Sequence, residues 1–455
     1  MKSPAHLDLA TSIRSLLADR AQAVPTGRLA RAMRSARGAV GLTRQVLHRD
    51  AFDPDAIAAV VSQRGELKGV AMKAGQILSY LDPSLPPDLR AALAALQTSA
   101  PKSPWPEVER TLRAELGGRA DVLLSRLDRE PLAVASIAQV HRASLPDVGE
   151  VAVKVRHPGI DAALRADFAM ASSGSAIARA LVPGAGVTVA DAIAEARAAM
   201  LEECDLSLEG RRQQRFAELF RDHPTIVIPR AHPSWSTSAV LTSSFRPGLG
   251  LDGWLDTAPS PALRDRFGVA LFELYVGALY RHGVFHADPH PGNYAFTPEG
   301  RVVVYDFGCV REFDPATLRA FRALARATRA DDREAIVAAL VALGARPPRD
   351  AAGRERRREL ARGFFGPLCR PGARPVSADA PMHAGSILRD KRAMMELALP
   401  GKLLFLLRLR FGLYAVLARI GAVADWSDLE ASFDAEADAR GGPVEAWSPR
   451  PGPST

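Results

Sequence analysis

Hydrophobic residues recur at helical spacing through the first hundred positions. Between residues 27 and 49 an apolar stripe repeats every three, four or seven positions and arginines lie off it, which predicts a basic amphipathic helix. Such a helix could rest on an anionic membrane or pack on its own domain. Residues 54–100 keep the helical spacing, with a proline-rich stop at 83–87, and residues 101–106 are predicted to be a linker.

The pattern changes to short β-type runs after Pro131. Runs at 132–143 and 150–155 are separated by the turn residues 146–149, and this arrangement predicts a β-hairpin. Apolar positions then return to helical spacing, which predicts a long helical stretch over about 159–222.

Two further β-type runs, at 225–228 and 238–242, precede a Gly/Pro-containing connector at 246–250. A helix is predicted from about 262 to 282, and a polar loop follows at 286–293. The rest of the pattern predicts short strands at 294–296 and 302–305, helices to about residue 440, and a Pro/Gly tail.

This order of elements is that of a bilobal, protein-kinase-like α+β fold. A small β-rich lobe comes first, a hinge follows, and a larger helical lobe then carries a polar loop. The predicted division is a basic helical extension (1–53), a helical segment (54–100), the small lobe with a helical insert (101–245), the helical lobe (246–440) and a flexible tail (441–455).

Composition narrows the functional classes. The 455 residues are 47% hydrophobic and 24% charged, as in ordinary globular proteins. The 59 basic and 51 acidic residues leave a net charge of +8, but aromatic residues are only 6% of the chain and do not interleave with the basic ones. We therefore expect no nucleic-acid partner.

The cysteine and apolar patterns suggest a cytoplasmic protein. Three widely separated cysteines form neither a disulfide framework nor a CxxC metal site. The first residues lack the apolar core of a secretory signal. The most apolar stretch, 403–424, is interrupted by Arg408, Arg410 and Arg419, so we expect no transmembrane helix and, at most, peripheral contact at the inner face of a membrane.

The strongest chemical signal is the segment His286-Ala287-Asp288-Pro289-His290-Pro291-Gly292-Asn293, followed by Asp306-Phe307-Gly308. A kinase catalytic loop needs an Asp to orient or deprotonate the acceptor and an Asn five positions later to hold Mg²⁺. Asp288 and Asn293 have this spacing, and Asp306 would bind Mg²⁺ next to the phosphates. Asn293 is the only asparagine in the chain.

A metal hydrolase is the rival interpretation of the same loop. His286, Asp288 and His290 are three potential ligands within five residues and could converge on Zn²⁺. That interpretation leaves Asn293 and Asp306 without a role.

Lys154 ends the apolar run Val151-Ala152-Val153-Lys154, which is the kinase arrangement for placing an ammonium against the α- and β-phosphates. It is one of seven lysines among 59 basic residues. The segment before it contains Ala133-Val134-Ala135-Ser136 in place of a glycine-rich loop, so the phosphates are not cradled in the usual way.

With these motifs the chain resembles the UbiB/AarF family of atypical protein-kinase-like proteins, called ADCK or coenzyme Q kinase-like proteins in eukaryotes. Lys73-Ala74-Gly75-Gln76 matches the family's KxGQ motif, Ala133 to Ser136 its Ala-rich loop, and Glu203-Cys204-Asp205 its ExD motif. Val134 departs from the commoner Ala, Leu206 replaces the aromatic residue often found after ExD, and no Ala-Pro-Glu follows Asp306-Phe307-Gly308.

The resemblance implies ATP or ADP binding with Mg²⁺, association with membranes, and a role in isoprenoid quinone (ubiquinone) or other lipid metabolism. It also implies that Glu209 pairs with Lys154, and that Lys73 and Gln76 project into the nucleotide site opposite Asp205 or Glu203 and gate it. The helix that carries KxGQ would occupy the place of a protein substrate.

We therefore expect ATP hydrolysis or phosphoryl transfer to a small or lipid-like acceptor. Two other functions stay open: a small-molecule kinase of the aminoglycoside or choline type, and a nucleotide-controlled accessory protein that extracts or presents a lipid. The acceptor and the oligomeric state are left open by the sequence.

Overall fold

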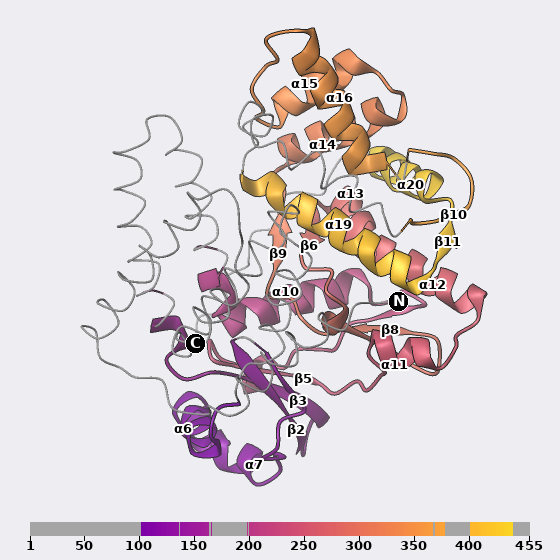
Figure 1. Ribbon diagram of the computed structural model, residues 1–455. Helices are drawn as coiled ribbons and strands as arrows, with labels where there is room; N and C mark the ends of the chain where they lie inside the picture. Colours follow the sequence, from indigo (N-terminus) through magenta and orange to yellow (C-terminus); the bar gives the residue numbers. More distant parts are fainter. Residues whose placement is uncertain are drawn as a thin grey trace, which may run out of the picture.

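The computed structural model describes residues 102–135, 137–162, 165, 198, 200–366, 369–377 and 401–439 (Figure 1). The predicted helices at 27–49 and 54–100, with Lys73 and Gln76, lie outside these residues, as does Ser136. The remainder forms two lobes, with the β-rich one drawn in indigo and magenta and the helical one in orange and yellow.

The small lobe is an antiparallel sheet with helices on one face. The strand order is β1-β2-β3-β5. Its elements are α6 (Trp105–Leu116), η1 (Gly117–Arg119), α7 (Ala120–Leu124), β1 (Ala133–Val134), β2 (Ala138–Leu145), β3 (Gly149–Arg156) and β5 (Val240–Ser244). The predicted hairpin is confirmed as β2–β3, whereas the predicted linker at 101–106 is wrong at its end, because α6 already begins at Trp105.

Alternation along β3 decides which side chains face the helices. Val151, Val153 and Val155 are buried in one cluster with residues of α6 and α7. Because side chains alternate between the faces of a strand, Lys154 points to the opposite face. It is paired with Val140 of β2 on one side and Leu241 of β5 on the other.

Helix α10 (Leu206–Leu219) lies between the sheet and the helical lobe (Figure 1). The long helical stretch predicted over 159–222 is interrupted here, because Asp205 is extended and its carboxylate accepts hydrogen bonds from the N–H groups of Ser207 and Leu208. An Asp N-cap starts a new helix in this way. A Cβ on Gly210 would lie 3.0 Å from Leu241, so α10 packs closely on β5.

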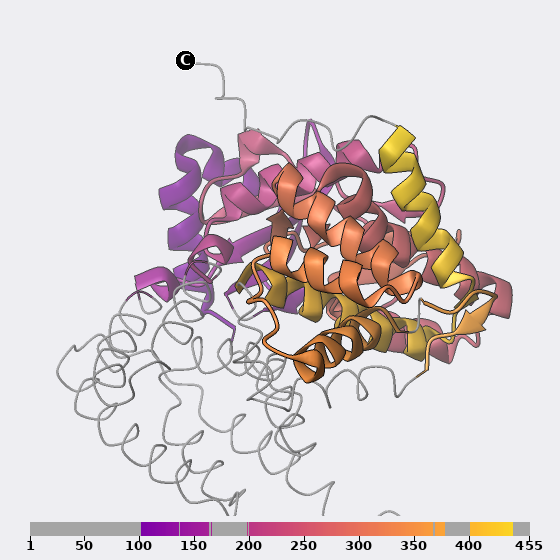
Figure 2. The ribbon, with the colours of Figure 1, turned by 90° about the horizontal axis from the view of Figure 1, so that it is seen from above.

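Among the described residues, the helical lobe contains three small sheets, β4-β8-β7, β6-β9 and β10-β11. Figure 2 shows its orange helices, residues 315–365, lying side by side. Two elements precede this lobe in the chain: β4 (Ile226–Val227), which pairs with β8, and η2 (Pro233–Trp235). The elements of the lobe itself are α11 (Leu251–Asp256), α12 (Pro261–Phe272), the π-helix η3 (Glu273–Gly277), α13 (Ala278–His282), β6 (Val284–His286), η4 (Pro291–Asn293), β7 (Tyr294–Phe296), β8 (Val302–Val304), β9 (Val310–Glu312), α14 (Pro315–Arg329), α15 (Arg333–Ala342), α16 (Ala351–Phe365), β10 (Arg374–Pro375), α19 (Gly401–Ile420), β11 (Val423–Ala424) and α20 (Trp426–Ala439).

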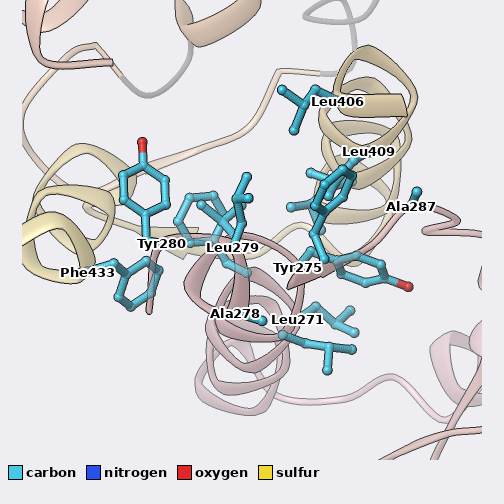
Figure 3. Packing of buried hydrophobic residues seen from close by; sticks show 14 of the residues in the cluster. Leu271, Tyr275, Ala278, Leu279, Tyr280, Ala287, Leu406, Leu409 and Phe433 are labelled. Carbon is cyan, nitrogen blue, oxygen red and sulfur yellow. The ribbon is translucent and has the colours of Figure 1, made fainter. Parts of the chain in front are cut away.

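Helix α19 crosses the core of this lobe. Figure 3 shows Leu406 and Leu409 of α19 beside Tyr275 and Leu279, and all four belong to the large buried cluster. Each of the three arginines of α19 pairs with a carboxylate: Arg408 with Asp288, Arg410 with Glu430, and Arg419 with Asp252. The stretch therefore packs on the helical lobe.

Among the described residues, no helix combines the length and the apolar character needed to cross a bilayer.

Candidate nucleotide site

Three candidate residues from distant parts of the chain meet between the lobes. The Lys154 Nζ atom lies 2.8 Å from Glu209 Oε1, 2.9 Å from Glu209 Oε2 and 3.2 Å from Asp306 Oδ2. Lys154 comes from β3, Glu209 from the first turn of α10, and Asp306 from the loop after β8. The predicted pairing of Lys154 with Glu209 is thus present in the structure.

Burial and charge act in opposite directions in this cluster. Burial lowers the pKa of Lys154, but the carboxylates of Asp306 and Glu209 outweigh it and hold that pKa above its usual value, so the ammonium stays charged. Burial raises the pKa of Glu209 to about 7, against the opposing effect of Lys154. The Glu209 side chain is 1% exposed and that of Asp306 is 38% exposed.

The polar loop fixes Asp288 beside Asn293. The Nδ2 group of Asn293 donates to the main-chain oxygen of Asp288 at 2.9 Å and to its Oδ2 atom at 3.2 Å. The amide oxygen of Asn293 takes no part in these two bonds. An amide oxygen and the carboxylate of Asp306 are ligands of the kind that Mg²⁺ prefers.

His286 is a structural part of the loop. Its Nε2 atom is hydrogen-bonded to the carbonyl of Asp306, so Nε2 carries the proton, and Nδ1 accepts from the N–H of Asp288 at 3.2 Å. Burial lowers the pKa of His286 and keeps the ring neutral. The ring also contacts Phe307, whose own ring packs on Phe216 of α10 at 5.1 Å.

These bonds argue against the zinc-hydrolase interpretation. Both ring nitrogens of His286 are engaged, and the Nδ1 atom of His290 accepts from the N–H of Gly292. Within the part of the chain that the structure describes, no three His, Cys, Asp or Glu side chains are placed to hold a metal ion together. A Mg²⁺ ion that is bound with phosphates needs only one or two protein carboxylates.

Sequence reasoning missed Arg408. It was considered only as an interruption of an apolar stretch, yet its Nη2 atom lies 2.7 Å from Asp288 Oδ1. One turn later in α19, a Cβ on Gly412 would lie 2.6 Å from Pro289 Cγ, so α19 packs directly against the polar loop 286–293. An arginine inside an apolar helix was the available signal, because such a charge needs a partner.

The π-helix η3 also contacts this loop. The hydroxyl of Tyr275 donates to the main-chain oxygen of Asp288 at 3.4 Å, and Figure 3 shows Tyr275 beside Ala287. π-Helical turns are rare and are frequent at functional sites. Asp288 is therefore held by three different elements of the fold: the loop itself, η3 and α19.

Ala135 of the Ala-rich segment is held by a chain of partly buried hydrogen bonds. The Nε2 atom of His157 donates to the carbonyl of Ala135 at 3.1 Å, and its Nδ1 atom accepts from the hydroxyl of Ser103 at 2.8 Å. The N–H of Ser103 donates to Gln139, whose amide in turn donates to Nε2 of His141 at 2.9 Å. Ala133 and Val134 form β1 beside β2.

The two ExD residues are placed differently. A Cβ atom added to Gly308 would lie 3.6 Å from Cγ of Glu203, so Glu203 is beside the Asp306-Phe307-Gly308 turn. The Oδ1 atom of Asp205 accepts the capping bonds of α10 and a bond from the Ser207 hydroxyl at 2.6 Å. Lys73 and Gln76, predicted to face these residues, lie outside the described part.

Glu202, which the sequence analysis did not single out, links the ExD segment to the rest of the site. Its Oε2 atom lies 2.7 Å from Nη2 of Arg212 on α10 and 2.9 Å from Nη1 of Arg311 on β9. Arg212 also donates to the carbonyl of Gly308 at 3.0 Å. This cluster connects α10, which carries Glu209, to the turn that follows Asp306.

Comparison with known proteins is consistent with this geometry. The profile of the ABC1 atypical kinase-like domain matches residues 95–340, just over half of the chain. "Atypical kinase COQ8, mitochondrial" of Saccharomyces cerevisiae is 29% identical over 63% of this chain and 57% of its own length. "AarF domain-containing protein kinase 1" of Xenopus tropicalis is 30% identical over 50% of this chain and 43% of its own.

Among solved structures, Rv3197 of Mycobacterium tuberculosis, determined as a complex with erythromycin, is similar. The match has a TM-score of 0.60 and 28% identity, and it covers 87% of this chain and 98% of the other. The chain spans about half the length of the curated relatives it matches.

Proposed function

Because the chain belongs to the ABC1 atypical kinase-like family, the family of UbiB and AarF, we propose that it binds ATP or ADP with Mg²⁺ and hydrolyses ATP or transfers its γ-phosphoryl group. The observation that carries this proposal is the meeting of Lys154, Glu209 and Asp306 next to the Asp288–Asn293 pair. In kinases these residue types hold phosphates, metal and acceptor.

Each residue has a definite task in this proposal. Lys154 would contact the phosphates, and Glu209 orients its ammonium. Asn293 and Asp306 would hold Mg²⁺, which neutralises phosphate charge when bound. Asp288 orients the attacking oxygen of water or an alcohol and accepts its proton, while that oxygen bonds to the γ-phosphorus and the bond to the β,γ-bridging oxygen breaks.

Both carboxylate oxygens of Asp288 already have partners, Arg408 at Oδ1 and Asn293 at Oδ2. The protein itself therefore fixes the orientation of this carboxylate. We propose that Asp288 acts mainly by orienting the nucleophile. Water or a small or lipid-like alcohol is the proposed acceptor, not a protein side chain.

Substitution of Asp306 tests the assignment. Asp306→Asn should abolish ATP turnover and the rise in melting temperature caused by Mg-ATP, because the main carboxylate ligand for the metal is lost. Asp252→Asn is the matched control, since Asp252 is 83% exposed and pairs with Arg419 on the surface. If Asp306→Asn retained normal turnover and stabilisation, the proposed metal site would be wrong.

The proposed metabolic role is in isoprenoid quinone, such as ubiquinone, or lipid metabolism, with peripheral membrane contact at the cytoplasmic face. It is supported by similarity to COQ8, a protein described as a mitochondrial atypical kinase. Comparing the quinone and lipid profiles of a deletion strain and an Asp306→Asn strain tests it. A normal profile in both strains would remove this assignment.

A nucleotide-controlled lipid accessory protein is the second candidate. The engagement of both Asp288 oxygens favours it, because that arrangement leaves the carboxylate bonded within the protein. Lipid-stimulated ATP turnover without a phosphorylated product would select this candidate. Formation of a phosphorylated lipid would select phosphoryl transfer.

A further inference from the structure

The proposed phosphate contacts place the base of a bound nucleotide toward the connector between the lobes. Lys154 lies opposite Leu241, and β5 runs three residues beyond Leu241 to Ser244 before the connector begins. At about 3.3 Å per residue, the end of β5 is roughly 10 Å from the register of Lys154. A nucleotide whose phosphates contact Lys154 and Asp306 is therefore long enough for its base to reach Ser244 to Arg246.

Tyr305 extends from the metal-binding residues to this connector. Its main-chain N–H donates to the carbonyl of Asn293 at 2.9 Å, and Asp306 is its neighbour in sequence. Its hydroxyl donates to the carbonyl of Arg246 at 2.7 Å. Tyr305 is 36% exposed, although Val304 before it and Phe307 two positions after it are buried. An aromatic surface is thus accessible at this position.

The connector is held on both sides of this hydrogen bond. The N–H of Phe245 donates to the main-chain oxygen of Glu150 in the small lobe at 2.8 Å. The N–H of Leu249 donates to the main-chain oxygen of Phe296 in the helical lobe at 2.9 Å. The Arg246 carbonyl lies between these two anchors. The ring of Tyr305 is therefore fixed at both ends before a ligand arrives, which reduces the entropy lost on binding.

We propose that Tyr305 is a base-contacting residue, whose ring is the surface on which the nucleotide base stacks and whose hydroxyl fixes the connector. The proposal rests on the nucleotide binding proposed above. Stacking on an aromatic ring accepts every base, because every base has a π-face. Tyr305 would consequently supply affinity for the nucleoside without selecting strongly between purines.

Two ligands separate a base contact from a phosphate contact. Binding of Mg-ATP and of Mg-tripolyphosphate, which has no base, would be measured by calorimetry on the full chain and on Tyr305→Leu and Tyr305→Phe. Tyr305→Leu should weaken Mg-ATP binding about tenfold or more and leave Mg-tripolyphosphate binding unchanged. Tyr305→Phe keeps the ring and should retain most of the ATP affinity.

Three results would overturn the proposal. Tighter ATP binding by Tyr305→Leu would mean that the ring blocks the base, and unchanged ATP binding would mean that it does not touch it. Equal weakening of both ligands would mean that Tyr305 acts only through Asp306. A wild-type chain that binds neither ligand would instead remove the proposed function itself, and this result is distinct from the other three.

Discussion

At the scale of single residues, Asp288 is the most constrained side chain of the site. Arg408 and Asn293 occupy its two carboxylate oxygens. Asn293 was predictable, because the five-residue spacing is local. Arg408 was not, because 120 residues separate it from Asp288 and no local pattern encodes that contact.

Replacing Arg408 tests whether this ion pair serves the reaction. Arg408→Gln should lower kcat for ATP turnover by about tenfold or more, because Asp288 loses the guanidinium that holds its orienting carboxylate in place. A tenfold loss corresponds to about 1.4 kcal/mol of transition-state stabilisation. KM for ATP should change little, because the proposed phosphate contacts are Lys154 and the metal residues. Steady-state kinetics would measure both constants.

Arg419→Gln is the control on the same helix. Arg419 and its partner Asp252 are both exposed, and exposed pairs contribute little. If Arg408→Gln and Arg419→Gln have the same kcat, the pair of Arg408 with Asp288 does not serve the reaction and the assignment is wrong.

At the scale of elements, α19 joins the helical lobe to the candidate site. Its apolar residues were sufficient to predict a helix, but its close packing against Pro289 depends on the absence of a Cβ atom at Gly412. The break before α10 had a readable signal, since Asp is a preferred N-cap residue. β6 and β9 have three residues each and depend on pairing between distant segments, such as His286 with Val310.

A methyl group at Gly412 should separate α19 from the loop. Gly412→Ala is expected to destabilise the protein by about 1–3 kcal/mol through overpacking, and to lower ATP turnover by moving Arg408. Gly253→Ala is the matched control in α11, where a Cβ meets nothing within 4 Å. That change should stabilise by up to about 1 kcal/mol.

Thermal unfolding and ATP turnover of the two glycine variants would be compared with those of the wild type. Equal stability and equal turnover in both variants would contradict the close contact between α19 and Pro289.

At the scale of the whole molecule, buried histidines make stability depend on pH. Burial lowers the pKa of His141 and of His157 in the folded protein. As pH falls below about 6.5, the unfolded chain binds protons that these folded-state histidines do not. Their contribution is therefore fully present above about pH 6.5 and declines below it, by up to about 1.4 kcal/mol per pH unit for each histidine.

A histidine variant isolates this effect from the other titrating groups. His157→Gln should be less stable than the wild type at pH 7.5, because the bonds to Ala135 and Ser103 are altered. The difference in unfolding free energy between the wild type and His157→Gln should narrow as pH falls from 6.5 to 5.5. Denaturant midpoints across this range would measure it, and parallel pH curves for the two proteins would show that His157 does not titrate in this way.

The two-lobed arrangement itself was predictable, because the order of strand-like and helical stretches and the motifs at Lys154, Asp288 and Asp306 are all local in sequence. How the lobes meet was not, because the contacts of Lys154 with Asp306 and of Tyr305 with Arg246 join segments far apart in the chain.

We propose that the junction between the lobes binds a nucleotide through a metal held by Asn293 and Asp306. Calorimetric titration of the full chain with ATP, in Mg²⁺ and again in EDTA, tests it most directly. Mg²⁺ should tighten ATP binding to the wild-type chain, and Asn293→Ala should lose most of this increase in ATP affinity. Equal ATP affinity with and without Mg²⁺ in the wild type would contradict it.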